Sequence, residues 1–126
     1  MIRPTAISRP FWDACREHRW VLPRCRQCAR HFFPPDVACI HCWSTDWAWV
    51  PASGRGTLYS FAIVHRAPSS AFPVPYAFAA VRLEEGVDVF SHVIGARHEA
   101  LVVDMPLVVA FEEVAPGEVL YRFRPA

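Results

Sequence analysis

The chain has 126 residues, of which 53% are apolar and 20% are charged, and its formal net charge is +1. This composition is typical of a packed globule and excludes a disordered tail, while the length allows one or two small modules. All thirteen basic residues are arginine, which excludes a lysine nucleophile or a lysine Schiff base.

The charges are distributed unevenly. Residues 1–55 carry eight arginines against four carboxylates, whereas residues 56–126 carry five arginines against eight carboxylates. No apolar run is long enough to cross a bilayer, and the first residues lack the apolar segment of a secretory signal. We therefore expect a cytoplasmic protein with no membrane partner, in which close cysteine pairs bind metal rather than form disulfides.

The first predicted element is a short helix over residues 8–19. Ser8 is a candidate N-cap, and apolar residues beginning with Phe11 recur on one side of this segment. Pro23 is expected to end the helix. Cys15 has no partner nearby in the sequence, so we interpret it as a small buried apolar residue.

The next segment holds four of the five cysteines in two Cys-x-x-Cys pairs, namely Cys25, Cys28, Cys39 and Cys42. Two such turns can direct four thiolates at one tetrahedral ion. Zinc is the expected occupant, but an iron centre of the rubredoxin type has the same ligands, so the spacing leaves both metals open. Four protein thiolates leave no position for water, and the ion is therefore expected to be structural.

Two other interpretations of the pairs fit the pattern less well. His31 or His41 could replace a cysteine, but His41 lies inside the second pair, where the turn would direct its ring away from the ion. A thiol-disulfide redox motif usually occurs singly within a βαβ unit, which this chain lacks.

Beyond a hinge near residues 51–54 the pattern is that of strands throughout. A meander of three strands followed by a hairpin favours a closed five-stranded barrel of the oligonucleotide/oligosaccharide-binding (OB) type over a sandwich. The chain is thus predicted to be mainly β, with a helix and metal ribbon over residues 1–52 and a barrel over residues 53–126. The predicted strands are residues 57–65, 76–83, 87–94, 107–114 and 119–124.

Two details of the strand region can be predicted. Glu84, Glu85 and Gly86 are expected to form a tight connection between the second and third strands. Alternation in the first strand assigns its apolar side chains to two faces, with Tyr59, Phe61 and Ile63 on one and Leu58, Ala62 and Val64 on the other.

Several segments together resemble one known family. The pairs CRQC and CIHC, then GRGTLYSFAIVHR, FPVPYAFAAVRLEEG and the late DMPLVVAFEEV and LYRFRPA, are similar to the DUF35 family over nearly the whole chain. The resemblance implies a rubredoxin-like zinc ribbon joined to an OB barrel. Two residues depart from the family pattern, because Ala29 follows the first cysteine pair where glycine is usual and Trp43 follows the second where a small residue is common.

The resemblance also implies a function. Members of the family are accessory subunits or fused domains of thiolase-like enzymes or of MaoC-like hydratases that act on acyl-CoA, and they are not expected to be enzymes alone. No nucleophile with a base, carboxylate pair or open metal site is legible in the sequence, which agrees with this expectation. For the same reason a small hydrolase of acyl thioesters is disfavoured.

The candidate residues for binding CoA or a partner combine arginine with aromatic rings. The guanidinium of arginine forms paired hydrogen bonds with phosphate, and apolar walls suit the pantetheine arm of CoA. Phe32 and Phe33 could equally fill the joint between the ribbon and the barrel. The full set is Arg30, Phe32, Phe33, Arg66, Phe72 and Tyr76.

Two further features concern partners. Trp43, Trp47 and Trp49 lie within seven residues, a density that suits either a small core or an interface. A single-stranded nucleic-acid-binding module is the alternative function, since zinc ribbons and OB barrels both serve it. The barrel region is net negative, which disfavours nucleic acid as a partner, because a protein that neutralises many phosphates needs positive charge along its binding groove.

Overall fold

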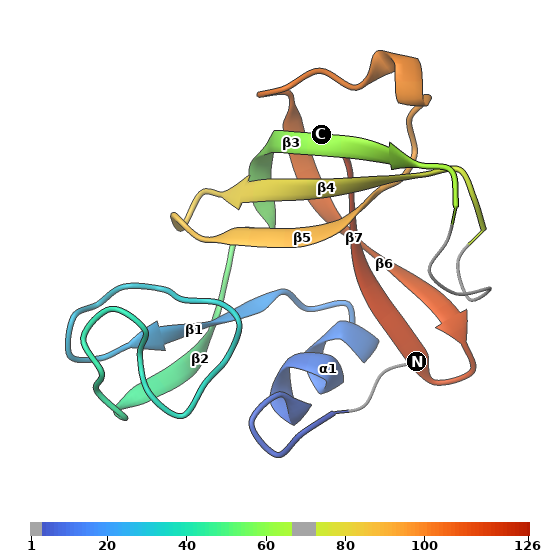
Figure 1. The fold of residues 1–126 in the computed structure, drawn as a ribbon. Helices are drawn as coiled ribbons and strands as arrows, with labels where there is room; N and C mark the ends of the chain where they lie inside the picture. The colour runs from blue at the N-terminus through green and yellow to red at the C-terminus, as the bar shows by residue number, and fades with distance from the viewer. Residues whose placement is uncertain (1–3, 67–72) are drawn as a thin grey trace.

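The computed structural model describes residues 4–66 and 73–126 of the chain. A two-stranded sheet and one helix lie beside a larger barrel (Figure 1). None of the helices in the described residues is long and apolar enough to cross a membrane. In chain order the elements are α1 (Arg9–Arg16), β1 (Val21–Cys25), β2 (Trp47–Pro51), β3 (Arg55–Val64), β4 (Tyr76–Leu83), β5 (Asp88–Val93), the 3₁₀ turn η1 (His98–Ala100), β6 (Pro106–Ala115) and β7 (Glu118–Pro125).

Helix α1 ends at Arg16, three residues before the end of the predicted helix over residues 8–19. Ser8 is the N-cap residue, but its side chain makes no capping bond to the helix. At the other end, His18 adopts a left-handed conformation with φ 58°, and the N–H of Arg19 donates to the carbonyl of Ala14 at 2.8 Å. This is a Schellman closure, which satisfies the last carbonyls. The helix therefore ends at Arg16, and the prediction that Pro23 ends it was wrong.

Pro23 instead lies in the middle of β1. Strand β1 pairs antiparallel with β2, with Cys25 opposite Trp47. Proline is tolerated here because a two-stranded sheet has only edge strands. The carbonyl of Pro23 accepts the N–H of Phe32 at 3.1 Å, which ties the cysteine-containing loop to the sheet.

Strands β3 to β7 form the predicted closed barrel. The strand order among the described residues is β3-β4-β5-β7-β6, and residues 55–57 of β3 pair with residues 106–108 of β6 to close it. Strands β5 and β7 are parallel and are joined where Val93 pairs with Phe123. Closure hides most of the sheet edges from solvent. The structure thus confirms a mainly β chain with a short helix, a cysteine ribbon and a five-stranded OB barrel.

A β-bulge in β3 changes the faces that alternation predicts. The register against β4 shifts between Leu58 and Ser60. Leu58 is therefore buried and Tyr59 is exposed, while Phe61 and Ile63 pack against the core on the same side as Leu58. The prediction that Tyr59, Phe61 and Ile63 share a face was wrong, because the extra residue of a bulge inverts the alternation.

The main core joins the helix to the barrel. Phe11, Ala14 and Cys15 of α1 are buried in one cluster with Leu58 and Phe123 of the barrel. This burial confirms the interpretation of Cys15 as a core residue, and it raises the pKa of the Cys15 thiol to about 12. The helix therefore completes the hydrophobic core of the barrel from outside the strands.

Candidate metal centre and its surroundings

Four cysteine sulfur atoms converge at the end of the ribbon, and all lie within 4.8 Å of one another. The Sγ atoms of Cys25 and Cys42 are 3.5 Å apart, and those of Cys28 and Cys39 are 3.7 Å apart. A tetrahedral ion with metal–sulfur bonds of about 2.3 Å has sulfur–sulfur edges of about 3.8 Å. The four side chains therefore fit one metal ion, as the paired spacing predicts.

The acidity of these thiols also suits a bound cation. The backbone N–H of Cys28 lies 3.5 Å from the Sγ atom of Cys25 and lowers the pKa of that thiol to about 7. At Cys42 the backbone N–H of Ser44 lowers the pKa, but burial and the neighbouring thiols together raise it to about 12. Four thiolates this close repel one another, so a cation is needed for all four to lose their protons.

His41 makes contacts away from the sulfur cluster. Its Nε2 lies 3.1 Å from the carbonyl oxygen of His31, and its Nδ1 lies 3.4 Å from Nη1 of Arg30. Only its backbone N–H faces the sulfurs, donating to Sγ of Cys39 at 3.3 Å. Both ring nitrogens are thus directed to other partners.

Each cysteine pair is followed by a residue in the left-handed conformation. Ala29 has φ 64° and Trp43 has φ 69°. Glycine adopts this region freely, whereas a residue with a side chain pays about 1 kcal/mol. The two residues that depart from the family pattern, Ala29 and Trp43, thus both adopt a backbone conformation that favours glycine.

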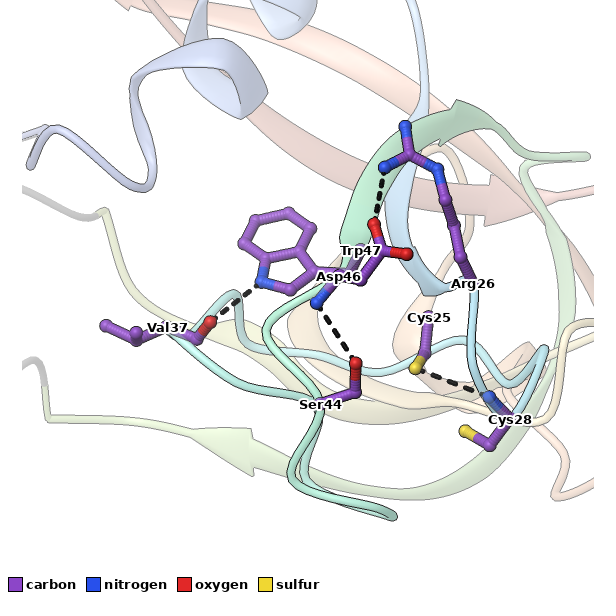
Figure 2. Close-up of polar contacts among 7 residues, drawn as sticks. All are labelled: Cys25, Arg26, Cys28, Val37, Ser44, Asp46 and Trp47. Carbon is purple, nitrogen blue, oxygen red and sulfur yellow. Dashed lines mark hydrogen bonds and ion pairs between the residues drawn. The ribbon is translucent and has the colours of Figure 1, made fainter.

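The frame around the cluster is held by polar contacts (Figure 2) and by an edge-to-face pair of aromatic rings. Nη1 of Arg26 lies 2.7 Å from the carboxylate of Asp46, and Nε1 of Trp47 donates to the carbonyl of Val37 at 3.1 Å. Trp47 also meets the ring of Phe32 edge to face, with centroids 5.4 Å apart. Trp47 is therefore a structural residue of the ribbon.

The candidate binding residues lie in different places. Arg30 is exposed on the ribbon, and Arg66 is exposed just after β3. Phe32 is only 1% exposed and fills the ribbon core, so its ring does not face solvent. Phe33 packs against the main core, where its ring centroid lies 5.5 Å from that of Phe11. Phe72 lies outside the described residues.

Tyr76 lines a cavity of about 300 Å³ that sequence reasoning missed. The ring of Tyr76 stacks on His92 at 4.2 Å, and Nε of the buried Arg122 lies 3.6 Å from Oε1 of Glu112. Burial, and secondarily the charge of Arg122, lowers the pKa of His92 to about 4. No sequence motif marks this cavity, because its residues come from separate strands that only the barrel brings together.

Comparisons with known proteins agree with this two-part architecture. A family model described as the rubredoxin-like zinc ribbon domain of ChsH2 matches residues 12–48. A second model, described as the C-terminal OB-fold domain of ChsH2, matches residues 49–112. A solved structure titled Ltp2-ChsH2(DUF35) aldolase contains a chain with 33% identity and a TM-score of 0.90, and the match covers 99% of this chain and 98% of that one.

Two curated relatives are named as subunits of enzymes. A probable enoyl-CoA hydratase alpha subunit of Thermomonospora curvata is 38% identical over 99% of this chain and 40% of its own length. The benzoylsuccinyl-CoA thiolase subunit BbsA of Geobacter metallireducens is 36% identical over 57% of this chain and 48% of its own length. The matched segments therefore cover less than half the length of each of these two relatives.

Proposed function

Because this chain belongs to the DUF35 family of proteins that join a zinc ribbon to an OB barrel, we propose that it is an accessory subunit of an acyl-CoA-processing enzyme. The partner is a thiolase-like enzyme that forms or cleaves carbon–carbon bonds, or a MaoC-like hydratase. The observation that carries this proposal is the likeness over nearly the whole chain to a hydratase alpha subunit, joined by the partial likeness to a thiolase subunit.

The metal in this proposal is one structural zinc ion held by the four cysteines. Zinc accepts four thiolates in tetrahedral geometry and brings no redox chemistry. With four protein ligands it leaves no position at which substrate could bind. The ribbon's own buried cluster is small, consisting of Cys25, Phe32 and Cys39, so the ion supplies much of the free energy that folds this segment.

Contact with CoA is the finer part of the proposal. Arg30 and Arg66 are exposed, and their guanidinium groups can form paired hydrogen bonds with phosphate. Tyr76 lines the barrel cavity, where its ring can contact the ligand. The buried Phe32 is left out of this contact, because its ring serves the ribbon core. In this proposal the chain contacts the CoA portion of the acyl-CoA substrate on which the partner enzyme acts.

One observation favours the second candidate, a binder of single-stranded nucleic acid. Phe78 and Phe90 stack with ring centroids 5.9 Å apart on the exposed face of β4 and β5, the face with which OB folds bind oligonucleotides. Beside them, however, Arg82 is paired with Asp88 at 3.0 Å. A paired arginine contributes little to binding phosphates, so the accessory subunit is the better supported function.

Native co-purification with mass identification tests the proposal. We expect the tagged chain to elute from lysate with a thiolase-like or hydratase-like protein, and elemental analysis to find one zinc per chain. Turnover of acyl-CoA by the purified chain alone would contradict the accessory role. Retention on single-stranded DNA that weakens steeply with salt would instead support the second candidate.

A further inference from the structure

The tip of the ribbon carries three exposed apolar side chains beside the metal ligands. Trp43 is 84% exposed, Val37 is 62% exposed and Ile40 is 55% exposed. These three residues, here called the knuckle patch, belong to the second cysteine turn and the loop that precedes it. Isolated apolar residues are normal on a protein surface, but a group that includes an almost fully exposed tryptophan indicates an interaction site.

The backbone of Trp43 makes this exposure more informative. Trp43 has φ 69°, a conformation that glycine adopts without strain and that a bulky side chain disfavours. An indole that is 84% exposed gains little packing in return. The nearby Trp47, by contrast, donates a hydrogen bond to Val37 and packs on Phe32. The N–H of Trp43 donates to the carbonyl of Cys39 at 2.9 Å, so the cysteine turn itself holds the left-handed backbone, but this turn does not require an exposed indole. A large apolar side chain at a position that favours glycine, with little packing inside the described part of the chain, is a reason to look for a contact outside it.

The patch is hollowed and carries a charge at its rim. A concavity of about 320 Å³ is lined by Asp36, Val37, Ala38, Cys39, Ile40 and Trp43. The Asp36 carboxylate accepts the N–H of Val37 at 2.6 Å, and no arginine or histidine among the described residues forms an ion pair with it. The surface that complements this concavity is therefore apolar at its centre, with a basic residue facing Asp36.

We propose that the knuckle patch is the docking surface for the partner enzyme subunit, which places an apolar side chain in the concavity and a lysine or arginine opposite Asp36. This inference rests on the proposed function, because it identifies where the partner of that function binds. The indole of Trp43 then gains in the complex the packing that it lacks in the isolated chain.

The two left-handed positions provide a matched pair of variants for the test. Trp43→Gly relieves the strain and removes the patch, whereas Ala29→Gly relieves the same kind of strain and leaves the patch intact. We expect both variants to retain one metal per chain and to melt at or above the temperature of the wild type. For the partner identified by native co-purification, Trp43→Gly should raise the dissociation constant at least 30-fold, while Ala29→Gly should leave it unchanged.

A second pair of variants separates the patch from exposed apolar side chains in general. Ile40→Ser should weaken association, whereas Phe90→Ser, a change at a barrel residue that is 62% exposed, should not. Asp36→Lys should slow association and reverse its dependence on salt, because it opposes the basic residue of the partner.

The outcomes distinguish this inference from the proposed function. If the wild type binds its partner and Trp43→Gly binds equally well, the docking surface is elsewhere and only this inference fails. A fall in melting temperature for Trp43→Gly without loss of binding would assign Trp43 to folding and overturn the inference too. If Trp43→Gly binds the enzyme subunit normally but no longer self-associates in sedimentation, the knuckle patch binds a second copy of this chain and the inference is wrong. A wild type that binds no enzyme subunit overturns both.

Discussion

Gly54 and Val109 meet at the point where the ribbon joins the barrel. The N–H of Val109 donates to the carbonyl of Gly54 at 2.7 Å, and a Cβ atom added to Gly54 would lie only 2.6 Å from Cγ1 of Val109. Gly54 also has φ 73°. The link between the two parts of the molecule therefore depends on a residue without a side chain.

Gly54→Ala should destabilise the protein more than Gly117→Ala. Gly117 has nearly the same backbone conformation, with φ 74°, but nothing lies within 4 Å of an added Cβ. Gly117→Ala should therefore cost about 1 kcal/mol for the left-handed backbone alone. Gly54→Ala should cost roughly 2–4 kcal/mol, because the clash with Val109 adds to that strain. Urea unfolding of the two variants measures the difference, and equal costs would show that Val109 moves aside freely.

Removal of the metal should unfold the ribbon. Cys39→Ser removes one of four ligands and leaves a buried hydroxyl, so we expect lost metal and loss of dispersed amide signals from residues 25–49 in the NMR spectrum. Cys15→Ala is the matched control, because it removes a buried cysteine of the main core that is no part of the cluster. It should keep the full metal content. A metal-free Cys39→Ser variant with an unchanged spectrum would contradict the structural role.

The depressed pKa of His92 predicts a loss of stability in acid. Its folded-state pKa is about 4, against about 6.5 in an unfolded chain. Between these two values the unfolded state binds a proton that the folded state does not, so the free energy of unfolding falls as the pH drops from 6.5 towards 4. His92→Phe retains a ring to stack on Tyr76 but cannot titrate, and its urea midpoint should fall less over this range.

The comparison between the two proteins isolates His92, because acid release of the metal affects both. Identical pH dependence in the wild type and in His92→Phe would show that the imidazole makes no contribution. An NMR titration of the His92 ring gives its folded-state pKa directly.

Binding of CoA should depend on the exposed arginines. Arg30→Ala and Arg66→Ala should each weaken CoA binding roughly tenfold or more, if each contributes a charged hydrogen bond to phosphate. Arg19→Ala is the control, since Arg19 is exposed just after α1 and is paired with Glu17. Calorimetry with CoA and with pantetheine, which lacks the nucleotide phosphates, should show the loss only for CoA. Unchanged affinity in both variants would remove these arginines from the site.

Much of the barrel could be predicted because its strands carry strong local signals. The expected strand over residues 76–83 coincides with β4, and Gly86, with φ 85°, completes the tight connection to β5. The group of four cysteines could be predicted as well, since two residues between the cysteines of each pair are typical of the tight turns that bring metal-binding sulfurs together.

The remaining features depended on tertiary contacts that local pattern does not contain. Pro23 indicates a helix end, yet it lies in β1 because an edge strand does not need its N–H. The bulge after Leu58 moves the following side chains to the opposite face of β3. Apolar residues occur on both faces of this strand, so the alternation of residue types could not locate the bulge. The cavity beside Tyr76 combines residues from four strands, and its buried Arg122 has an ordinary sequence context.

The packing of α1 against β7 also has a consequence for biosynthesis. Tyr121, whose ring meets those of Phe11 and Trp12 at 5.5 and 6.2 Å, is synthesised more than a hundred residues after them. Until then Phe11 has only its partners in the first half of the chain, such as Phe33, and the contacts of both rings with β7 are missing. The face of α1 that meets β7 therefore stays uncovered until β7 has been synthesised, and during that interval a chaperone or a subunit that assembles during translation can bind it.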